Sequence, residues 1–167
     1  GMVPMVTLNH FTLPVWLAAR GGWLSSDAPS LLAAYCSKVV TELGDLVDWY
    51  CTITEPGVVA FGGYLGALGF PPGTTTMATW NTAIEGLRKG LIQSRDAVKR
   101  ARPEAKVGAT HAMVEYEYNE AGRPLMEFFR TQMEDRFFEV CGDDDFIAVQ
   151  TYTREVLDPP SFLAPLT

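Results

Sequence analysis

Glu55 is the residue of this sequence with the clearest chemical potential, because it stands between an apolar run and a proline in the segment Leu46–Pro56, LVDWYCTITEP. A carboxyl group beside buried tryptophan and tyrosine has a raised pKa and can act as a general acid. The alternative is a glutamate that caps the turn after Pro56, since proline cannot continue a central strand. The local sequence leaves both roles open.

His111 and the three cysteines are the other side chains of functional types. His111 ends a short predicted strand, where a histidine acts as a ligand or proton shuttle, or fills a hydrogen-bonded place in the core or at the rim. Cys36, Cys51 and Cys141 are widely separated in apolar segments, which indicates reduced core thiols and a cytoplasmic protein. Since no metal-binding spacing and no phosphate-binding glycine motif is present, the sequence predicts neither a metal nor a cofactor.

Further acidic residues form two groups. Glu115, Glu117 and Glu120 follow a predicted strand in a polar segment, where such acids are usually solvated. Asp143–Asp145 precede a strand, so we expect them at the end of the sheet opposite Glu55. Neither group is expected to supply the second carboxylate of a catalytic pair.

The composition describes one soluble globular domain, 1–167. The chain has 167 residues, of which 47% are hydrophobic and 20% charged. Its net charge of −7 argues against nucleic acid and against anionic membrane surfaces as partners, and no apolar run has the length of a membrane span. The start lacks the basic region of a signal peptide. We interpret Gly1 as a tag remnant and 157–167 as a proline-rich tail.

Four apolar runs predict strands, at Val3–Leu8, within Leu46–Pro56, at Ala105–Thr110 and at Phe146–Val149. The second run is nearly continuous in β-branched and aromatic residues, which is typical of a parallel strand covered on both faces. The carboxyl ends of parallel strands meet at one edge of a sheet, where α/β proteins build their sites. Glu55 is therefore predicted at the functional edge.

Three stretches between these runs have the period of amphipathic helices. The glycine- and aromatic-rich stretch Gly57–Gly73 shows no helical polar face and is predicted to be a long loop at the rim of the site. The alternation predicts an α/β fold with a parallel sheet and right-handed crossovers, without choosing between an open sheet and a barrel. The helical periods are set by Leu31, Tyr35, Val39 and Leu43; by Trp80, Ile84, Leu87, Leu91 and Val98; and by Leu125, Phe129, Met133, Phe137 and Val140.

Four segments resemble motifs of glycoside hydrolase family 1, the β-glucosidase family, in the family's order. Pro4–Pro14, PMVTLNHFTLP, is similar to the third-strand motif, and Thr52–Pro56, TITEP, to the acid/base motif usually written T-x-N-E-P. Gly63–Gly73 resembles the loop that follows that motif. Asp145–Arg154, DFIAVQTYTR, resembles the sixth-strand motif that ends in N-Y-Y-T-R.

The resemblance implies a partial (β/α)8 TIM barrel, in which about four parallel strands alternate with helices as barrel strands three to six. A complete barrel takes roughly 250 residues, so we expect a half barrel. Exposed edge strands and an exposed inner face are then expected to drive association into a homodimer or a larger oligomer.

The resemblance also implies a retaining β-glycosidase that hydrolyses β-glucosides or similar sugars, with Glu55 as the acid/base. By the same comparison His10 hydrogen-bonds the sugar and Phe11 lines its pocket. Gln150 matches an asparagine of the sixth strand, and Tyr152 matches a tyrosine that positions the nucleophile.

Thr54 and Tyr64 are the two remaining substrate-binding candidates. Thr54 stands where the family has asparagine, and threonine has no amide donor for the sugar. Tyr64, on the predicted rim loop, is the candidate for sugar stacking.

The family's nucleophile belongs to a seventh-strand T-E-N-G motif, and the sequence stops before it; the second-strand arginine is also missing. The isolated chain is therefore expected to have little or no activity. The alternative is a non-catalytic sugar-binding or assembly module that binds a β-glycoside or monosaccharide, completed by another chain with the remaining strands. An unrelated flavodoxin-like binder is a third hypothesis, which the absence of a phosphate loop disfavours.

Overall fold

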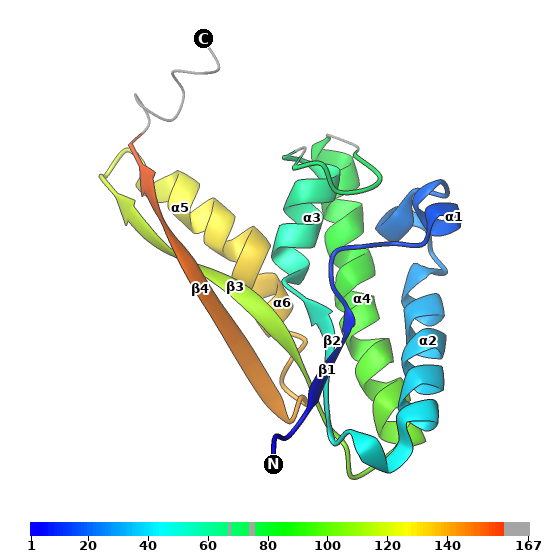
Figure 1. Ribbon diagram of the computed structural model, residues 1–167. Coiled ribbons are helices and arrows are strands. Elements are labelled where there is room, and N and C mark those ends of the chain that lie inside the picture. The colour runs from blue at the N-terminus through cyan, green and yellow to red at the C-terminus, as the bar shows by residue number, and fades with distance from the viewer. Residues whose placement is uncertain (67, 74–75, 159–167) are drawn as a thin grey trace.

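The computed structural model describes residues 1–66, 68–73 and 76–158 and contains one four-stranded sheet in which every pairing is parallel. The strands follow each other in the order β1-β2-β3-β4, and the helices gather along one side of the curved sheet (Figure 1). A flavodoxin-like sheet has the order 2-1-3-4-5, so this order excludes that alternative and confirms the partial barrel. The strands are β1 (Met5–Asn9), β2 (Trp49–Thr54), β3 (Lys106–Tyr118) and β4 (Phe146–Leu157).

Each crossover between strands contains at least one helix, as a right-handed parallel fold requires. The crossover from β2 to β3 contains two helices, and the one from β3 to β4 is interrupted by a π-helical turn. The helical elements are α1 (Val15–Ala18), η1 (Gly22–Leu24), α2 (Ala28–Leu43), η2 (Gly44–Leu46), α3 (Pro56–Tyr64), α4 (Met77–Ala101), α5 (Arg123–Arg130), the π-turn η3 (Thr131–Asp135) and α6 (Arg136–Phe138).

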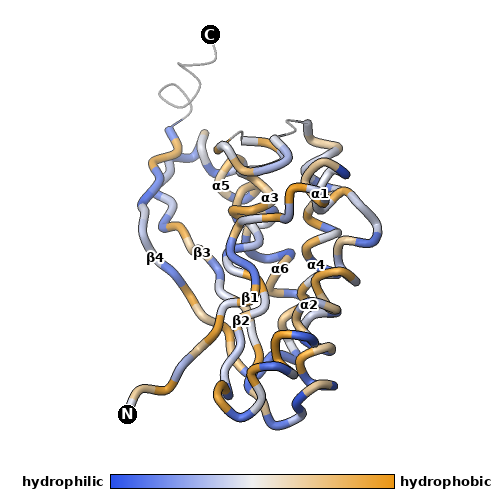
Figure 2. Tube along the Cα trace, turned by 45° about the vertical axis from the view of Figure 1, so that its right-hand side comes forward, coloured by the Kyte–Doolittle hydropathy of each residue, from blue (hydrophilic) through white to orange (hydrophobic). Residues whose placement is uncertain are grey.

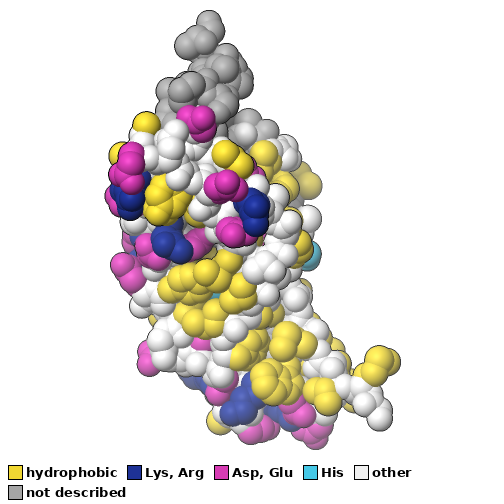
Figure 3. Space-filling model, turned by 90° about the vertical axis from the view of Figure 1, so that its left-hand side faces the viewer, with side chains coloured by type: hydrophobic (Ala, Val, Ile, Leu, Met, Phe, Trp, Pro, Cys, Tyr) yellow, Lys and Arg dark blue, Asp and Glu magenta, His cyan; other side chains and the backbone are white. Residues whose placement is uncertain are grey.

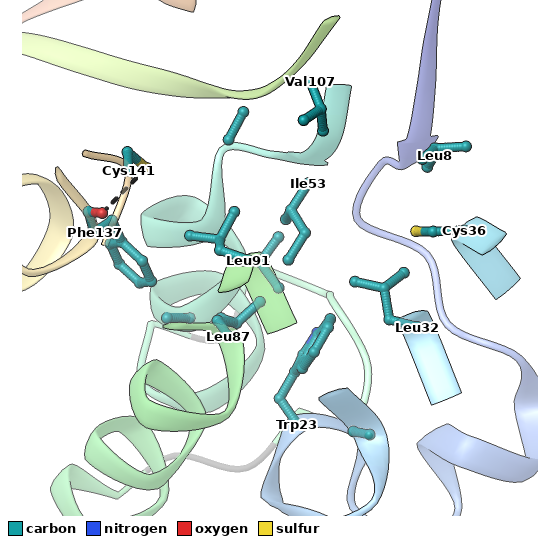
Figure 4. Close-up of a cluster of buried hydrophobic side chains, with 14 of the residues drawn as sticks. Leu8, Trp23, Leu32, Cys36, Ile53, Leu87, Leu91, Val107, Phe137 and Cys141 are labelled. Carbon is teal, nitrogen blue, oxygen red and sulfur yellow. Dashed lines mark hydrogen bonds between the residues drawn. The ribbon is translucent and has the colours of Figure 1, made fainter. Parts of the chain in front are cut away.

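The core lies between the sheet and its helices. Leu8, Ile53 and Val107 come from three neighbouring strands and are 6% exposed or less, and they lie near the apolar side chains of α2 and α4 (Figure 4). The predicted stripe of α4 is confirmed, because all of its members are buried. These members are Trp80, Ile84, Leu87, Leu91 and Val98.

The buried face of α2 lies one residue further along the chain than predicted. Leu32, Cys36 and Val40 are buried, whereas Tyr35 of the predicted stripe is 51% exposed. Two adjacent rows of this helix are apolar, so the four-residue period fits both rows. Only packing against the sheet and α4 selects between them.

The prediction of a loop over Gly57–Gly73 is wrong in its first half, because Pro56–Tyr64 forms α3. This helix is buried on nearly every side, including Gly57, Val59, Ala60 and Gly62. A helix buried all round carries no polar face, so the amphipathic signal that would have revealed it is missing. Residue 67 and residues 74–75 of this region lie outside the described part of the chain.

The last two strands are longer than predicted. β3 continues through Glu115–Tyr118, beyond the strand predicted at Ala105–Thr110, and β4 continues through Gln150 and Tyr152 to Leu157. The alternating Glu-Tyr-Glu-Tyr pattern is a period-two signal that the high charge concealed. Figure 2 shows that β4 begins hydrophobic and becomes hydrophilic along its middle part, before the strand ends on the hydrophobic pair Val156 and Leu157.

The third predicted helix is broken into α5, η3 and α6. Phe137 of the predicted stripe is buried, as expected, but Leu125, Phe129 and Met133 are only half-buried, and the residues next to two of them, Met126 and Glu134, are buried instead. A π-turn contains more residues per turn than an α-helix, so it rotates the buried face between the two halves.

Cys36, Cys51 and Cys141 are free thiols in the core, as predicted. Within the described residues, no helix has the length and hydrophobicity needed to cross a membrane. The predicted tail extends to residue 167, and its residues 159–167 lie outside the described part of the chain.

Candidate active site

Glu55 follows the last residue of β2 and immediately precedes α3. Its main chain adopts the left-handed conformation, with φ 49° and ψ 60°, which is unfavourable for a residue with a side chain. Its amide donates a hydrogen bond of 2.8 Å to the carbonyl of Thr110 on β3, and its carbonyl accepts one of 3.0 Å from Val59. Glu55 occupies the N-cap position of α3, but its side chain makes no capping hydrogen bond. The turn-cap interpretation is therefore wrong.

The environment of the Glu55 carboxyl group favours its protonated form. The residue is 7% exposed, and this burial raises its pKa above the usual value. A side-chain hydrogen bond with Tyr152 and the electrostatic interaction with His10 act in the opposite direction, and burial outweighs both. A carboxyl group with a raised pKa holds a proton nearer neutral pH, as a general acid requires.

The fold brings three of the predicted site residues together. His10 follows β1 and Tyr152 belongs to β4, so they reach Glu55 from strands on opposite sides of β2. Gln150 donates a hydrogen bond of 2.5 Å from Nε2 to the Tyr152 hydroxyl. Its own Oε1 is buried and has no hydrogen-bond partner among the described residues. The roles of these residues in sugar binding stay predictions.

Phe11 also takes a left-handed conformation, with φ 65°, and it places an aromatic surface beside His10. The two rings meet edge to face with centroids 4.5 Å apart, and Phe11 stacks on Phe70 at 4.9 Å. Phe70 was missed in the sequence, although it is an aromatic residue of the rim loop. Its position immediately before Pro71 and Pro72 was the available signal.

Tyr64 does not line the site, contrary to the prediction. It is fully buried at the end of α3, and its hydroxyl accepts a hydrogen bond of 2.6 Å from the amide of Trp23. Burial raises the pKa of Tyr64 to about 12. The tyrosine therefore belongs to the core, and Phe70 is the aromatic residue that this loop places beside Phe11.

Thr54 is 3% exposed, and its hydroxyl lies 3.9 Å from the Sγ of Cys51. The β2–β3 register shifts between these two residues. Thr54 thus belongs to the buried end of β2 and presents little surface to a ligand.

The acids after β3 are engaged with arginines. Glu115 and Glu117 lie 3.1 and 3.7 Å from Arg154, and Glu120 lies 2.7 Å from Arg123. These pairs are largely exposed, in agreement with the expectation that the acids are solvated.

At the other end of the sheet, Asp145 precedes β4 and pairs with Lys99 at 2.6 Å. This confirms that the Asp143–Asp145 group lies away from the carboxyl ends of the strands. Among the described residues, the side chains that shift the pKa of the Glu55 carboxyl are Tyr152 and His10, and neither carries a second carboxyl group.

His111 is a core residue. It is 2% exposed, its Nε2 lies 3.6 Å from the Sγ of Cys141, and its ring centroid is 4.8 Å from that of Phe138. Burial lowers its pKa to about 4. The interpretation as a hydrogen-bonded core histidine is therefore confirmed, and His111 faces the helices rather than the site. Within the described residues, no three His, Cys, Asp or Glu side chains are grouped to hold a metal ion.

Comparison with known proteins gives consistent matches. The family model described as "Glycosyl hydrolase family 1" matches residues 1–156. A β-galactosidase of Pyrococcus woesei is 38% identical over 97 residues, which are 50% of this chain and 19% of the relative. β-Glucosidase A of Acetivibrio thermocellus is 33% identical over 112 residues, which are 65% of this chain and 24% of the relative.

A solved structure, Fpglu1 from Fervidobacterium pennivoraus, superposes with a TM-score of 0.83 at 27% identity, covering 93% of this chain and 36% of the other. This chain therefore spans about a fifth to a quarter of the length of the two curated relatives. Because the family model matches nearly the whole sequence, the chain belongs to glycosyl hydrolase family 1.

Proposed function

We propose that this chain forms the acid/base side of a retaining β-glycosidase site and binds β-glucosides or related sugars. The observation that carries the proposal is the Glu55 carboxyl group at the carboxyl end of β2, buried, with a raised pKa and flanked by His10 and Tyr152. Membership of the family and the names of the two curated relatives support the substrate class.

In this proposal, protonated Glu55 donates its proton to the glycosidic oxygen while the bond from that oxygen to the sugar breaks. The resulting Glu55 carboxylate then takes a proton from the water that hydrolyses the glycosyl intermediate. The raised pKa favours the first step, and the Tyr152 hydrogen bond and the electrostatic interaction with His10 favour the carboxylate needed in the second. His10 and Phe11 contact the sugar, and Gln150 and Tyr152 form the opposite wall.

A retaining site needs a second carboxylate about 5 to 5.5 Å from the first, as nucleophile. Among the described residues, none of the groups acting on Glu55 is such an acid. The proposal therefore includes the expectation that this chain alone binds sugar but does not turn it over. A further chain that supplies the remaining strands would have to bring the nucleophile.

We also propose that the chain associates with a second copy of itself. Hydrophobic residues of the edge strand β4 are exposed, with Ile147 at 46%, Val149 at 50% and Val156 at 60%. Figure 3 shows hydrophobic side chains gathered across the middle of that side of the molecule. A long unpaired edge with exposed apolar residues is a site of self-association.

The function is tested by titrating the purified chain with a β-glucoside while amide chemical shifts are followed by NMR. We expect saturable shifts at Glu55 and Phe11 that are lost in His10→Ala, while the exposed helix variant Glu42→Gln behaves as the wild type. No saturable shift in the folded chain would contradict a sugar site.

Turnover of nitrophenyl β-glucoside separates the half site from a complete one. We expect no hydrolysis above the rate of Glu55→Gln. Hydrolysis that Glu55→Gln abolishes and Glu42→Gln preserves would mean that this chain alone completes the catalytic pair.

A further inference from the structure

The strained main chain of Glu55 needs an explanation beyond its own hydrogen bonds. A residue with a side chain in the left-handed region costs on the order of 1–3 kcal/mol and persists only where the surroundings fix it. The hydrogen bond to Thr110 fixes the amide of Glu55, and the bond from Val59 fixes its carbonyl to α3. The position of α3 itself therefore decides whether Glu55 can keep this conformation.

The first turn of α3 is packed against another backbone at Gly57. A Cβ atom on Gly57 would lie 2.2 Å from the carbonyl oxygen of Met133 and 3.0 Å from its carbonyl carbon. Both sides of this contact are main chain, so neither side yields by a simple side-chain rotation. Glycine at position 57 is what allows α3 to approach Met133 so closely.

Met133 belongs to the π-turn η3, Thr131–Asp135. Such turns are rare, and they occur frequently at functional sites. The residue after Met133 is a buried acid, because the Glu134 side chain is 4% exposed. Its Oε1 accepts a hydrogen bond of 3.4 Å from the amide of Val114 on β3, and its Oε2 lies 4.0 Å from Nε of Arg130.

Two consecutive residues of the π-turn thus contact two different elements. Glu134 accepts a hydrogen bond from β3, and the carbonyl of Met133 packs against α3. We propose that η3 positions Glu55: Glu134 anchors the turn on β3, and the Met133 carbonyl, packed on Gly57, holds the first turn of α3 where Glu55 must be left-handed. β3 then holds Glu55 twice, directly through Thr110 and indirectly through η3. The consequence for catalysis rests on the proposed function, whereas the conformational effect does not.

Two glycine-to-alanine variants test this proposal. Gly57→Ala forces η3 and α3 apart, whereas Gly142→Ala introduces a methyl group where nothing lies within 4 Å. The Glu55 carboxyl is titrated by NMR in each variant. We expect the Glu55 pKa to move by about half a unit or more in Gly57→Ala, because its burial and its Tyr152 hydrogen bond both depend on its position. Gly142→Ala should leave it unchanged.

Glu134 provides a second test that does not depend on the folding of Gly57→Ala. Glu134→Ala removes the acceptor for Val114, whereas Glu134→Gln keeps a side-chain oxygen there. We expect Glu134→Ala to shift the Glu55 pKa and Glu134→Gln to retain the wild-type value. The proposal is overturned if Glu134→Ala folds, as judged by amide shifts of α2 and α4, and leaves the Glu55 titration unchanged.

The readout keeps this inference separate from the proposed function. A wild-type chain that fails to bind sugar contradicts the function but leaves the effect of Gly57→Ala on Glu55 measurable. An unchanged Glu55 titration in folded variants contradicts the positioning role and leaves sugar binding untouched.

Discussion

The backbone amide of Glu55 donates a hydrogen bond of 2.8 Å to the carbonyl of Thr110. Thr110 is the register partner of Thr54 on the adjacent strand, so the bond extends the β2–β3 pairing one residue beyond β2. The main chain of Glu55 is thereby held by the sheet, although the residue lies beyond the last residue of β2. This arrangement fixes the Glu55 carboxyl relative to His10 and Tyr152, which come from other strands.

Tyr64→Phe is expected to destabilise the fold without affecting the site. The substitution leaves the buried Trp23 amide without the acceptor that now lies 2.6 Å away, a loss of about 1–3 kcal/mol. Urea unfolding measures it, with Tyr118→Phe as the matched control because Tyr118 is 38% exposed. If Tyr64→Phe weakened sugar binding and left the stability unchanged, Tyr64 would be a sugar-binding residue and the prediction would be wrong.

His111 is expected to make the protein less stable in acid. Its pKa falls from 6.5 to about 4 on burial, so the unfolded chain binds the proton more readily and stability is lost as the pH falls from about 6.5 to about 4. The loss amounts to about 3.5 kcal/mol at most, at roughly 1.4 kcal/mol per pKa unit. Denaturant unfolding at several pH values should show that the free energy of unfolding of the wild type decreases over this pH range. If the free energy of unfolding of His111→Leu decreased equally with pH, the prediction would be refuted.

Asp144 is expected to have the opposite pH dependence. Burial raises its pKa from 3.8 to about 6 despite Arg95 at 3.4 Å, so its contribution favours the folded state below pH 3.8 and is lost as the pH rises through about 6. Asp144→Asn should therefore gain up to about 3 kcal/mol relative to the wild type on going from pH 4 to pH 7. Asp143→Asn is the control, because that side chain is 89% exposed; equal behaviour of the two variants would contradict the prediction.

Association through β4 is expected to respond to charge at its exposed apolar positions. Ile147→Lys combined with Val149→Lys should convert a dimer or larger species into a monomer, as measured by sedimentation velocity. Val15→Lys, at an apolar position of α1 that is 86% exposed, should leave the assembly intact. A wild-type chain that is already monomeric at micromolar concentration would refute self-association.

The elements that the sequence predicted well are those whose hydrophobic pattern has one interpretation. β2 is nearly continuous in β-branched and aromatic residues, and Pro56 follows it two positions after its last residue, so both the strand and the edge position of Glu55 follow from local physics. The proximity of Glu55 to His10 and Tyr152 could not be predicted from the local sequence, because it depends on the order of the strands in the sheet. The family resemblance supplied that order.

The errors arose where tertiary packing replaces the local signal. α3 has no polar face because it is buried all round, and α2 has two adjacent apolar rows that only packing can distinguish. The π-turn follows no apolar period, since the residue it turns inward is the acid Glu134. Tyr64 and Phe70 lie six positions apart in one aromatic segment, and only the structure shows which of them reaches Phe11.

NMR titration of the Glu55 side-chain carboxyl tests most directly whether Glu55 is a proton donor in a sugar site. Glu55→Gln assigns the resonance. We predict a Glu55 pKa above the ordinary value of about 4.3, because burial disfavours the carboxylate, and a further change in that pKa when a β-glucoside is added. A Glu55 that titrates at or below the ordinary value and does not respond to the sugar would contradict the account.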